Sequence, residues 1–251
     1  FTFGDSVDAG YSISTGTILA YGSVVANNFG YQGSATIRMV GSTNQAITGV
    51  ATARIPNLEI ASTGGTVSYS GTLFLLQNYT YTSGTVAAGT STLRLWRSIS
   101  PGVYTPGSIV HNDVTFAGST GTYSIVGTMI VGGVLTLSDQ ASTAGQLNTG
   151  TLSARGNVVY SSFGYGGSAP LVLEGSTSST ITVGASAARM SGLVTINKSG
   201  GSQVTFASTV SYGATGQDLV VAGGTLNLGG YDLTVNDVLT VDPGATLRCN
   251  G

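Results

Sequence analysis

Short stretches in which apolar and polar residues alternate recur along the whole chain, and two of them illustrate the pattern. Residues 37–40 (IRMV) and 171–174 (LVLE) keep apolar side chains at their first and third positions, whereas the second and fourth positions vary among Arg, Val and Glu. Successive side chains of a β-strand point to opposite faces. The alternation therefore predicts short strands with one buried side and one side facing water.

These two stretches belong to a long internal repeat. Residues 17–43 and 151–177 align without a gap at an offset of 134, and 14 of the 27 positions are identical. Residues 1–5 (FTFGD) match residues 135–139 (LTLSD) at the same offset, so we expect the repeat to begin with the first residues of the chain. A repeat of this length indicates that the fold is built from stacked, similar units.

A shorter unit of the form GGxLxL occurs at residues 131–137 and again at 221–228. Apolar rungs of roughly 20 residues, with Gly, Asn and Ser at the corners, favour an all-β right-handed parallel β-helix, a β-solenoid with a nested internal repeat. Tandem β-sandwiches are the alternative, and a propeller is also built from many short strands. Roughly eleven to twelve rungs, stacked about 4.8 Å apart, would make a rod about 50–60 Å long.

The repeat also predicts one continuous elongated domain. We expect a first solenoid repeat at 1–113, connecting rungs at 114–134 and a second solenoid repeat at 135–251. Residues 96–113 contain the only tryptophan and two of the five prolines, and Pro-Gly pairs mark turns. This stretch is therefore predicted to be a protruding loop at the end of the first repeat, or a join between the repeats.

The composition agrees with an all-β fold and limits the partners. Charged residues make up 7% of the chain, against roughly 25% in typical globular proteins. Helical domains usually need Lys, Glu and Arg to cover their solvent faces, so helices are disfavoured. The net charge is −2 and no basic stripe is present, so no nucleic-acid partner is expected. No apolar run is long enough for a transmembrane helix, so no membrane insertion is expected.

Residues 199–248, apart from 211–217, resemble the repeats of secreted bacterial β-helix proteins. The segments that carry the resemblance are SGGSQVTFASTV and DLVVAGGTLNLGGYDLTVNDVLTVDPGATLR. The family includes autotransporter passenger domains and filamentous-haemagglutinin-like surface proteins. The resemblance implies a right-handed parallel β-helix that is exported to the cell surface or beyond, and it transfers no functional residue.

No catalytic constellation is found, so we do not expect an enzyme. His111 is the only histidine, which excludes a multi-histidine metal site within one chain, and it is interpreted as a loop residue. Asp232, Asp237 and Asp242 recur every five residues. Turn and cap roles are the favoured interpretation for these acids, with a Ca²⁺ site as the alternative. No cofactor is therefore expected.

The favoured hypothesis is a structural role. Bare β edges recruit further strands unless they are capped or charged, and the chain begins and ends in strand-like sequence. We therefore expect a subunit of an extracellular or cell-surface fibre or sheath that assembles with itself head to tail. Cys249 is expected either to crosslink the junction or to be a free buried thiol. The predicted subunit interface consists of Phe1, Phe3, Leu239, Val241, Leu247 and Cys249.

The second hypothesis is a binding module, an adhesin or phage-fibre segment cut from a longer solenoid, which would have the same bare β edges at its ends. In that case Trp96 and Tyr104 would contact surface glycans through their ring faces. A polysaccharide-active enzyme is the third and least favoured hypothesis, because it requires at least two acids within reach of each other.

Overall fold

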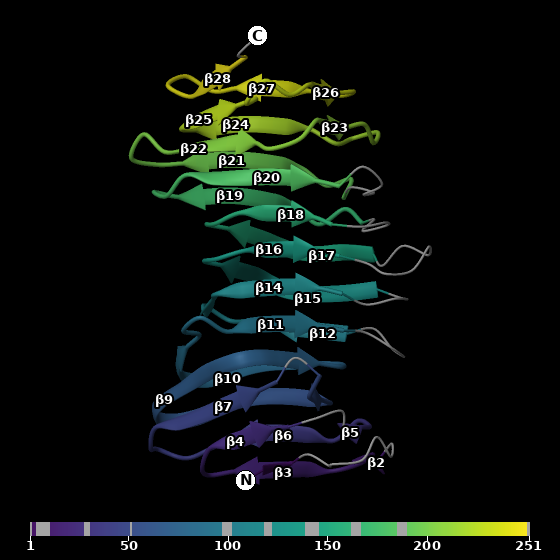
Figure 1. The fold of residues 1–251 in the computed structure, drawn as a ribbon, viewed down its shortest axis with the longest axis vertical. Coiled ribbons are helices and arrows are strands. Elements are labelled where there is room, and N and C mark those ends of the chain that lie inside the picture. The colour runs from purple at the N-terminus through teal and green to yellow at the C-terminus, as the bar shows by residue number, and fades with distance from the viewer. Residues whose placement is uncertain are drawn as a thin grey trace.

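Figure 1 shows the computed structural model of the chain, in which strands are stacked in layers along one long axis. The N-terminal and C-terminal strands lie at opposite ends of this axis. The structure describes residues 2–3, 11–27, 31–50, 52–96, 102–117, 122–138, 146–161, 167–184 and 190–249. All regular secondary structure among these residues is β-strand.

In each coil the chain passes through up to three columns of strands, here called A, B and C, and each strand pairs in parallel with those above and below it. Column A contains β3 (Thr17–Ala20), β6 (Thr36–Met39), the first parts of β9 (Asn57–Leu75) and β10 (Tyr79–Ala87), β12 (Gly102–Thr105), and the first parts of β15 (Thr122–Val131) and β17 (Gln146–Ala154).

Column B follows column A in the coil. Its lower series contains β1 (Thr2–Phe3), β4 (Val24–Ala26), β7 (Gln45–Gly49), the middle of β9 and the last part of β10. Its upper series contains β13 (Val110–His111), the last parts of β15 and β17, β19 (Leu171–Gly175), β21 (Val194–Lys198), β24 (Leu219–Gly223) and β27 (Leu239–Val241). Among the described residues its first strand, β1, and its last strand, β27, each pair on one side only.

Column C completes the coil. It contains β8 (Arg54–Ile55), the last part of β9, β11 (Thr92–Leu95), β14 (Asp113–Phe116), β16 (Leu135–Leu137), β18 (Val158–Tyr160), β20 (Ser179–Val183), β22 (Gln203–Phe206), β25 (Thr225–Asn227) and β28 (Thr246–Arg248). Two further parallel pairs are formed by β2 (Tyr11–Ser12) with β5 (Tyr31–Gln32), and by β23 (Val210–Tyr212) with β26 (Leu233–Val235).

This arrangement confirms the predicted parallel β-solenoid. The ten strands of column C are linked without interruption, so nine turns separate β8 from β28. The coil length varies around the expected 20 residues: Ile18 pairs with Ile37, and Tyr79 pairs with Tyr104. Tandem β-sandwiches are excluded for the described residues, because sandwiches are built from antiparallel strands and every pairing here is parallel.

The core consists of ladders of apolar side chains. Inward residues of one strand lie directly above those of the strand below, and burying each large apolar side chain contributes about 1.5–3 kcal/mol. The predicted inward residues Ile37, Met39, Leu171 and Leu173 are all buried. One column C ladder is formed by Leu75, Leu95, Phe116, Leu137, Tyr160 and Val183.

The two copies of the sequence repeat lie on different faces of the solenoid. Residues 17–20 belong to column A, whereas their equivalents at 151–154 belong to column B. Likewise β4 belongs to column B, and its equivalent β18 belongs to column C. The offset of 134 residues therefore corresponds to six turns plus one face, so the repeat specifies strands and corners but no fixed face of the rod.

The corners between strands are held by side chains and by glycines. The side-chain oxygens of Asn78, Asp113 and Asn157 accept the backbone N–H groups of Val103, Val134 and Thr180, each in the next coil, at 2.8, 2.7 and 2.9 Å. Gly71 has φ +70°, and an added Cβ would lie 2.1 Å from the carbonyl oxygen of Gly49. Only glycine fits such a close approach between coils.

The predicted loop at 96–113 needs correction. Residues 102–105 and 110–111 are the strands β12 and β13, and they belong to the stack, while residues 97–101 lie outside the described part of the chain. The alternation of Gly102, Val103 and Tyr104 between buried and exposed positions is the signature of a rung. The Pro-Gly pairs concealed this pattern because they mark corners of the solenoid as well as loops.

Candidate functional site

The last coil exposes residues that occupy core positions elsewhere. Leu239 and Val241 lie directly above Leu219 and Val221 in column B. The lower pair is fully buried, whereas Leu239 and Val241 are each 40% exposed. Val238, which directly precedes this strand, is 50% exposed. The end of the rod therefore presents an apolar surface, here called the end-coil surface and defined by Val238, Leu239, Val241 and Leu247.

The strands of this coil also have open edges. Within the described residues, β27 pairs only with β24, and β28 pairs only with β25. The outer backbone groups of both strands are therefore available to a further parallel strand. At the opposite end of column B, β1 pairs only with β4 among the described residues.

The structure brings most of the predicted interface residues together. Leu239, Val241, half-buried Leu247 and Cys249 all belong to the last coil, and Cys249 is an exposed free thiol that follows β28. The backbone of Phe3 lies in β1, at the opposite end of the rod. Phe1 and the side chain of Phe3 lie outside the described part of the chain.

The three acids near this end accept hydrogen bonds from backbone N–H groups. The carboxylate of Asp237 accepts the N–H of Gly216 at 2.8 Å, and the backbone carbonyl groups of Asp232 and Asp242 accept the N–H groups of Val210 and Ala245. Among the described residues, no group of three or more His, Cys, Asp or Glu side chains could hold a metal ion. The alternative Ca²⁺ site is thus not formed by these three acids.

The predicted glycan contacts are not both at the surface. Tyr104 is fully buried, and its ring stacks on that of Tyr123 with centroids 5.9 Å apart. Its ring faces are therefore not available to a sugar, because position 104 is an inward position of β12. Trp96 is partly buried, packs edge-on against Phe74, and has the guanidinium group of Arg94 5.4 Å from its ring centroid.

His111 is a core residue, which corrects its interpretation as a loop histidine. It lies in β13 below Val131, is 1% exposed, and packs edge-on against the ring of Tyr79. Neither ring nitrogen has a hydrogen-bond partner among the described residues. Burial lowers the pKa of His111 from 6.5 to about 4, because the charged imidazolium would lose its hydration.

The only lysine ties three coils together, a role that the sequence analysis missed. Lys198 Nζ donates to the carbonyl oxygens of Arg155 and Glu174 at 2.9 and 2.8 Å. The Glu174 carboxylate in turn accepts from Ser153 and forms an ion pair with Arg155. Burial lowers the pKa of Lys198, and the charge of Glu174 opposes this shift. The fact that the chain contains a single lysine was the only signal in the sequence that pointed to this role.

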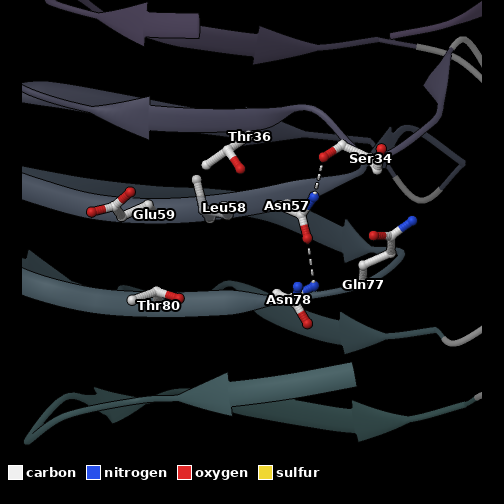
Figure 2. Close-up of a pocket in the computed structure, with 8 residues that line it drawn as sticks. All are labelled: Ser34, Thr36, Asn57, Leu58, Glu59, Gln77, Asn78 and Thr80. Atoms are coloured by element: carbon white, nitrogen blue, oxygen red, sulfur yellow. Dashed lines mark hydrogen bonds between the residues drawn. The ribbon is translucent and has the colours of Figure 1, made fainter. Parts of the chain in front are cut away.

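A polar groove of about 350 Å³ opens on the side wall of column A (Figure 2). Ser34, Asn57 and Asn78 lie one above another on successive coils. Glu59 belongs to the same strand as Asn57, and Thr80 lies in β10, which begins directly after Asn78. The groove is lined by Ser34, Thr36, Asn57, Leu58, Glu59, Gln77, Asn78 and Thr80.

Asn57 fixes the shape of this groove. Its side-chain amide donates to the carbonyl oxygens of Ser34 and Ala35 at 2.8 and 3.2 Å, and its side-chain oxygen accepts the N–H of Asn78 at 3.1 Å. Sequence reasoning did not find the groove, because residues 34–80 come together only through the coil-to-coil register.

Comparison with models of known protein families, with curated proteins and with solved structures gives no match to this chain. The described residues include no helix that is long and apolar enough to cross a membrane. The candidate functional sites of this chain are the end-coil surface and the side-wall groove.

Proposed function

We propose that this protein is a non-catalytic structural subunit of an extracellular or cell-surface fibre or sheath, and that copies stack head to tail. The observation that carries the proposal is the exposure of Leu239 and Val241 at positions that are fully buried one coil below. A further coil placed on the end-coil surface would remove these side chains from water and continue both core ladders.

The backbone supports the same contact. β27 and β1 lie at opposite ends of column B, and each has an unpaired edge among the described residues. Pairing β27 of one copy with β1 of the next would extend the parallel ladder. A contact between two different surfaces of the subunit forms a filament when the rotation does not close.

The surface chemistry suits a protein that works outside the cell. Charged residues make up only 7% of the chain, and the single lysine is buried. Thr or Ser occupies many outward strand positions, and with one lysine and seven arginines the chain offers few sites to lysine-directed or arginine-directed proteases. The resemblance of residues 199–248 to secreted bacterial β-helix proteins supports the same location.

The test is negative-stain electron microscopy and sedimentation of the purified chain over a range of concentrations. We expect filaments with an axial repeat of about 50–60 Å, given strands stacked about 4.8 Å apart. Reductant should leave the filaments in place, because Cys249 is the only cysteine and head-to-tail stacking holds the Cys249 residues of successive copies about one axial repeat apart, too far for a disulfide. Stable monomers at every concentration would contradict the proposal.

A pair of variants makes this test specific. The double substitution Leu239→Asp and Val241→Asp should abolish filaments, because it would bury two carboxylates at the contact. Thr240→Asp, on the outward side of the same strand, is the matched control and should leave assembly in place. Filaments that survive the double substitution would show that the contact lies elsewhere.

A further inference from the structure

The groove of Figure 2 has hydrogen-bonding capacity that the fold does not use. Gln77 Nε2 donates to the carbonyl oxygen of Gly33 and Asn78 Oδ1 accepts from Val103, which leaves Gln77 Oε1 and Asn78 Nδ2 uncommitted among the described residues. The hydroxyl groups of Thr36 and Thr80 form no hydrogen bond to other described residues either. One acceptor, one donor group and two hydroxyls thus converge on one groove.

We propose that this groove binds a segment of a neutral saccharide chain. A sugar hydroxyl both donates and accepts hydrogen bonds, so a run of hydroxyls can satisfy Gln77 Oε1, Asn78 Nδ2 and the threonine hydroxyls at the same time. Thr36 and Thr80 lie in β6 and β10, and Gln77 and Asn78 directly precede β10. The bonds of Asn57 to Ser34 and Asn78 hold neighbouring coils at a fixed spacing here. The protein therefore loses little conformational entropy when a ligand binds in the groove.

Charge favours a neutral ligand over an acidic one. Glu59 is the only ionisable residue that lines the groove, and its Oε1 lies 3.2 Å from Nε of Arg38 and accepts from Thr82. This ion pair leaves the groove without a net positive charge that would attract a carboxylate or sulfate, whereas a sugar hydroxyl can donate to the Glu59 carboxylate. An uncharged saccharide therefore suits the site better than an acidic polysaccharide.

The backbone around the groove argues against a peptide ligand. Peptides commonly bind β proteins by adding a strand to an open sheet edge. Here β9 pairs with β6 on one side and with β10 on the other, through Leu58 on both sides. No backbone edge is open at the groove, so recognition must use side chains.

The experiment is a heteronuclear NMR titration of the full chain with cellohexaose, mannohexaose and chitohexaose, and with an oligogalacturonate of similar length as the charged probe. It is run under conditions that keep the chain monomeric. We expect saturable shifts of the side-chain amides of Gln77 and Asn78 with at least one neutral probe, and weaker shifts with the oligogalacturonate. No saturable shift at these amides with any neutral probe, or tighter binding of the charged one, would overturn the proposal.

Two isosteric variants separate binding from folding. Thr80→Val removes one hydroxyl from the groove and should raise the dissociation constant about 2-fold to 12-fold, as expected for one hydrogen bond. Thr136→Val removes an outward hydroxyl from column C and should leave the dissociation constant unchanged. Equal effects of the two substitutions would also overturn the proposal. The end-coil surface takes no part in this site, so its failure as an assembly contact would leave the result intact.

Discussion

The last two coils of the rod carry closely similar strands, yet their side chains differ in burial. Leu219 in β24 and Leu226 in β25 are fully buried, whereas Leu239 in β27 is 40% exposed and Leu247 in β28 is only half-buried. Each exposed residue lies directly above its buried counterpart. Alternation along a strand thus decides which side chains point inward, and the next coil decides whether they are buried. Stability in such a stack is shared between neighbouring coils.

The largest expected effect comes from truncating an inner residue on either side of this boundary. Leu226→Ala should lower the free energy of unfolding by about 2–5 kcal/mol, because it leaves a cavity between two coils. Leu247→Ala should cost less than about 1.5 kcal/mol in the monomer, since that side chain is only half-buried. Urea denaturation at low protein concentration measures both losses.

The concentration dependence sharpens this comparison. If copies stack end to end, the loss caused by Leu247→Ala should grow with protein concentration, because assembly buries the last coil. The loss caused by Leu226→Ala should stay nearly constant. Equal losses at low concentration would show that the last coil is already covered in the isolated chain.

The second expected effect tests how completely the middle coils exclude water. The pKa of His111 is about 4 in the folded chain and 6.5 in the unfolded chain, so the unfolded state binds the proton first as the pH falls. The contribution of His111 to the free energy of unfolding is therefore fully present above pH 6.5. It falls by about 3 kcal/mol as the pH decreases from 6.5 to about 4.

His111→Leu isolates this contribution. The variant should lack this part of the pH dependence. The carboxylates titrate in both proteins, so subtracting one curve of unfolding free energy against pH from the other should remove their contribution. At neutral pH the variant should be at least as stable, because two buried ring nitrogens without partners are replaced by an apolar side chain. Identical pH profiles for the two proteins would mean that water reaches the ring of His111.

The smallest expected difference concerns glycines at corners. Gly71→Ala should lower the free energy of unfolding by more than 2 kcal/mol, a rough estimate that adds a clash with Gly49 to the left-handed backbone. Gly244→Ala in the last coil should cost only about 1–2 kcal/mol, because its φ is +89° but its added Cβ meets nothing within 4 Å. Thermal unfolding measures the loss for each variant. Equal losses would show that the neighbouring coil shifts to make room for the added methyl group at position 71.

The local pattern was sufficient to predict the strands and their inward sides. Ile37 and Leu171 were assigned to the core from alternation alone, and both are buried. The predicted loop failed at Tyr104 and His111, because short rungs separated by Pro-Gly corners have the same composition as a loop. Neither residue has neighbours in sequence that reveal burial, since the coils above and below supply the covering atoms.

The candidate sites depend on the register between coils, which one sequence does not determine. Ser34, Asn57 and Asn78 are separated by more than 20 residues each, and small changes in coil length would move them apart. The end-coil surface was easier to predict, because its residues Leu239 and Leu247 lie close together in the sequence. Its burial state still required the structure.

The one-face rotation between the two repeat copies has a consequence for how such a protein can evolve. A duplicated segment that is not a whole number of turns presents its outward residues in a new direction, as residues 17–20 and 151–154 do in columns A and B. Mutations that improve an outward patch in one copy can thus be copied to another side of the rod by recombination. Lengthening the chain would then decorate several sides of the rod with related surfaces without a change in the core.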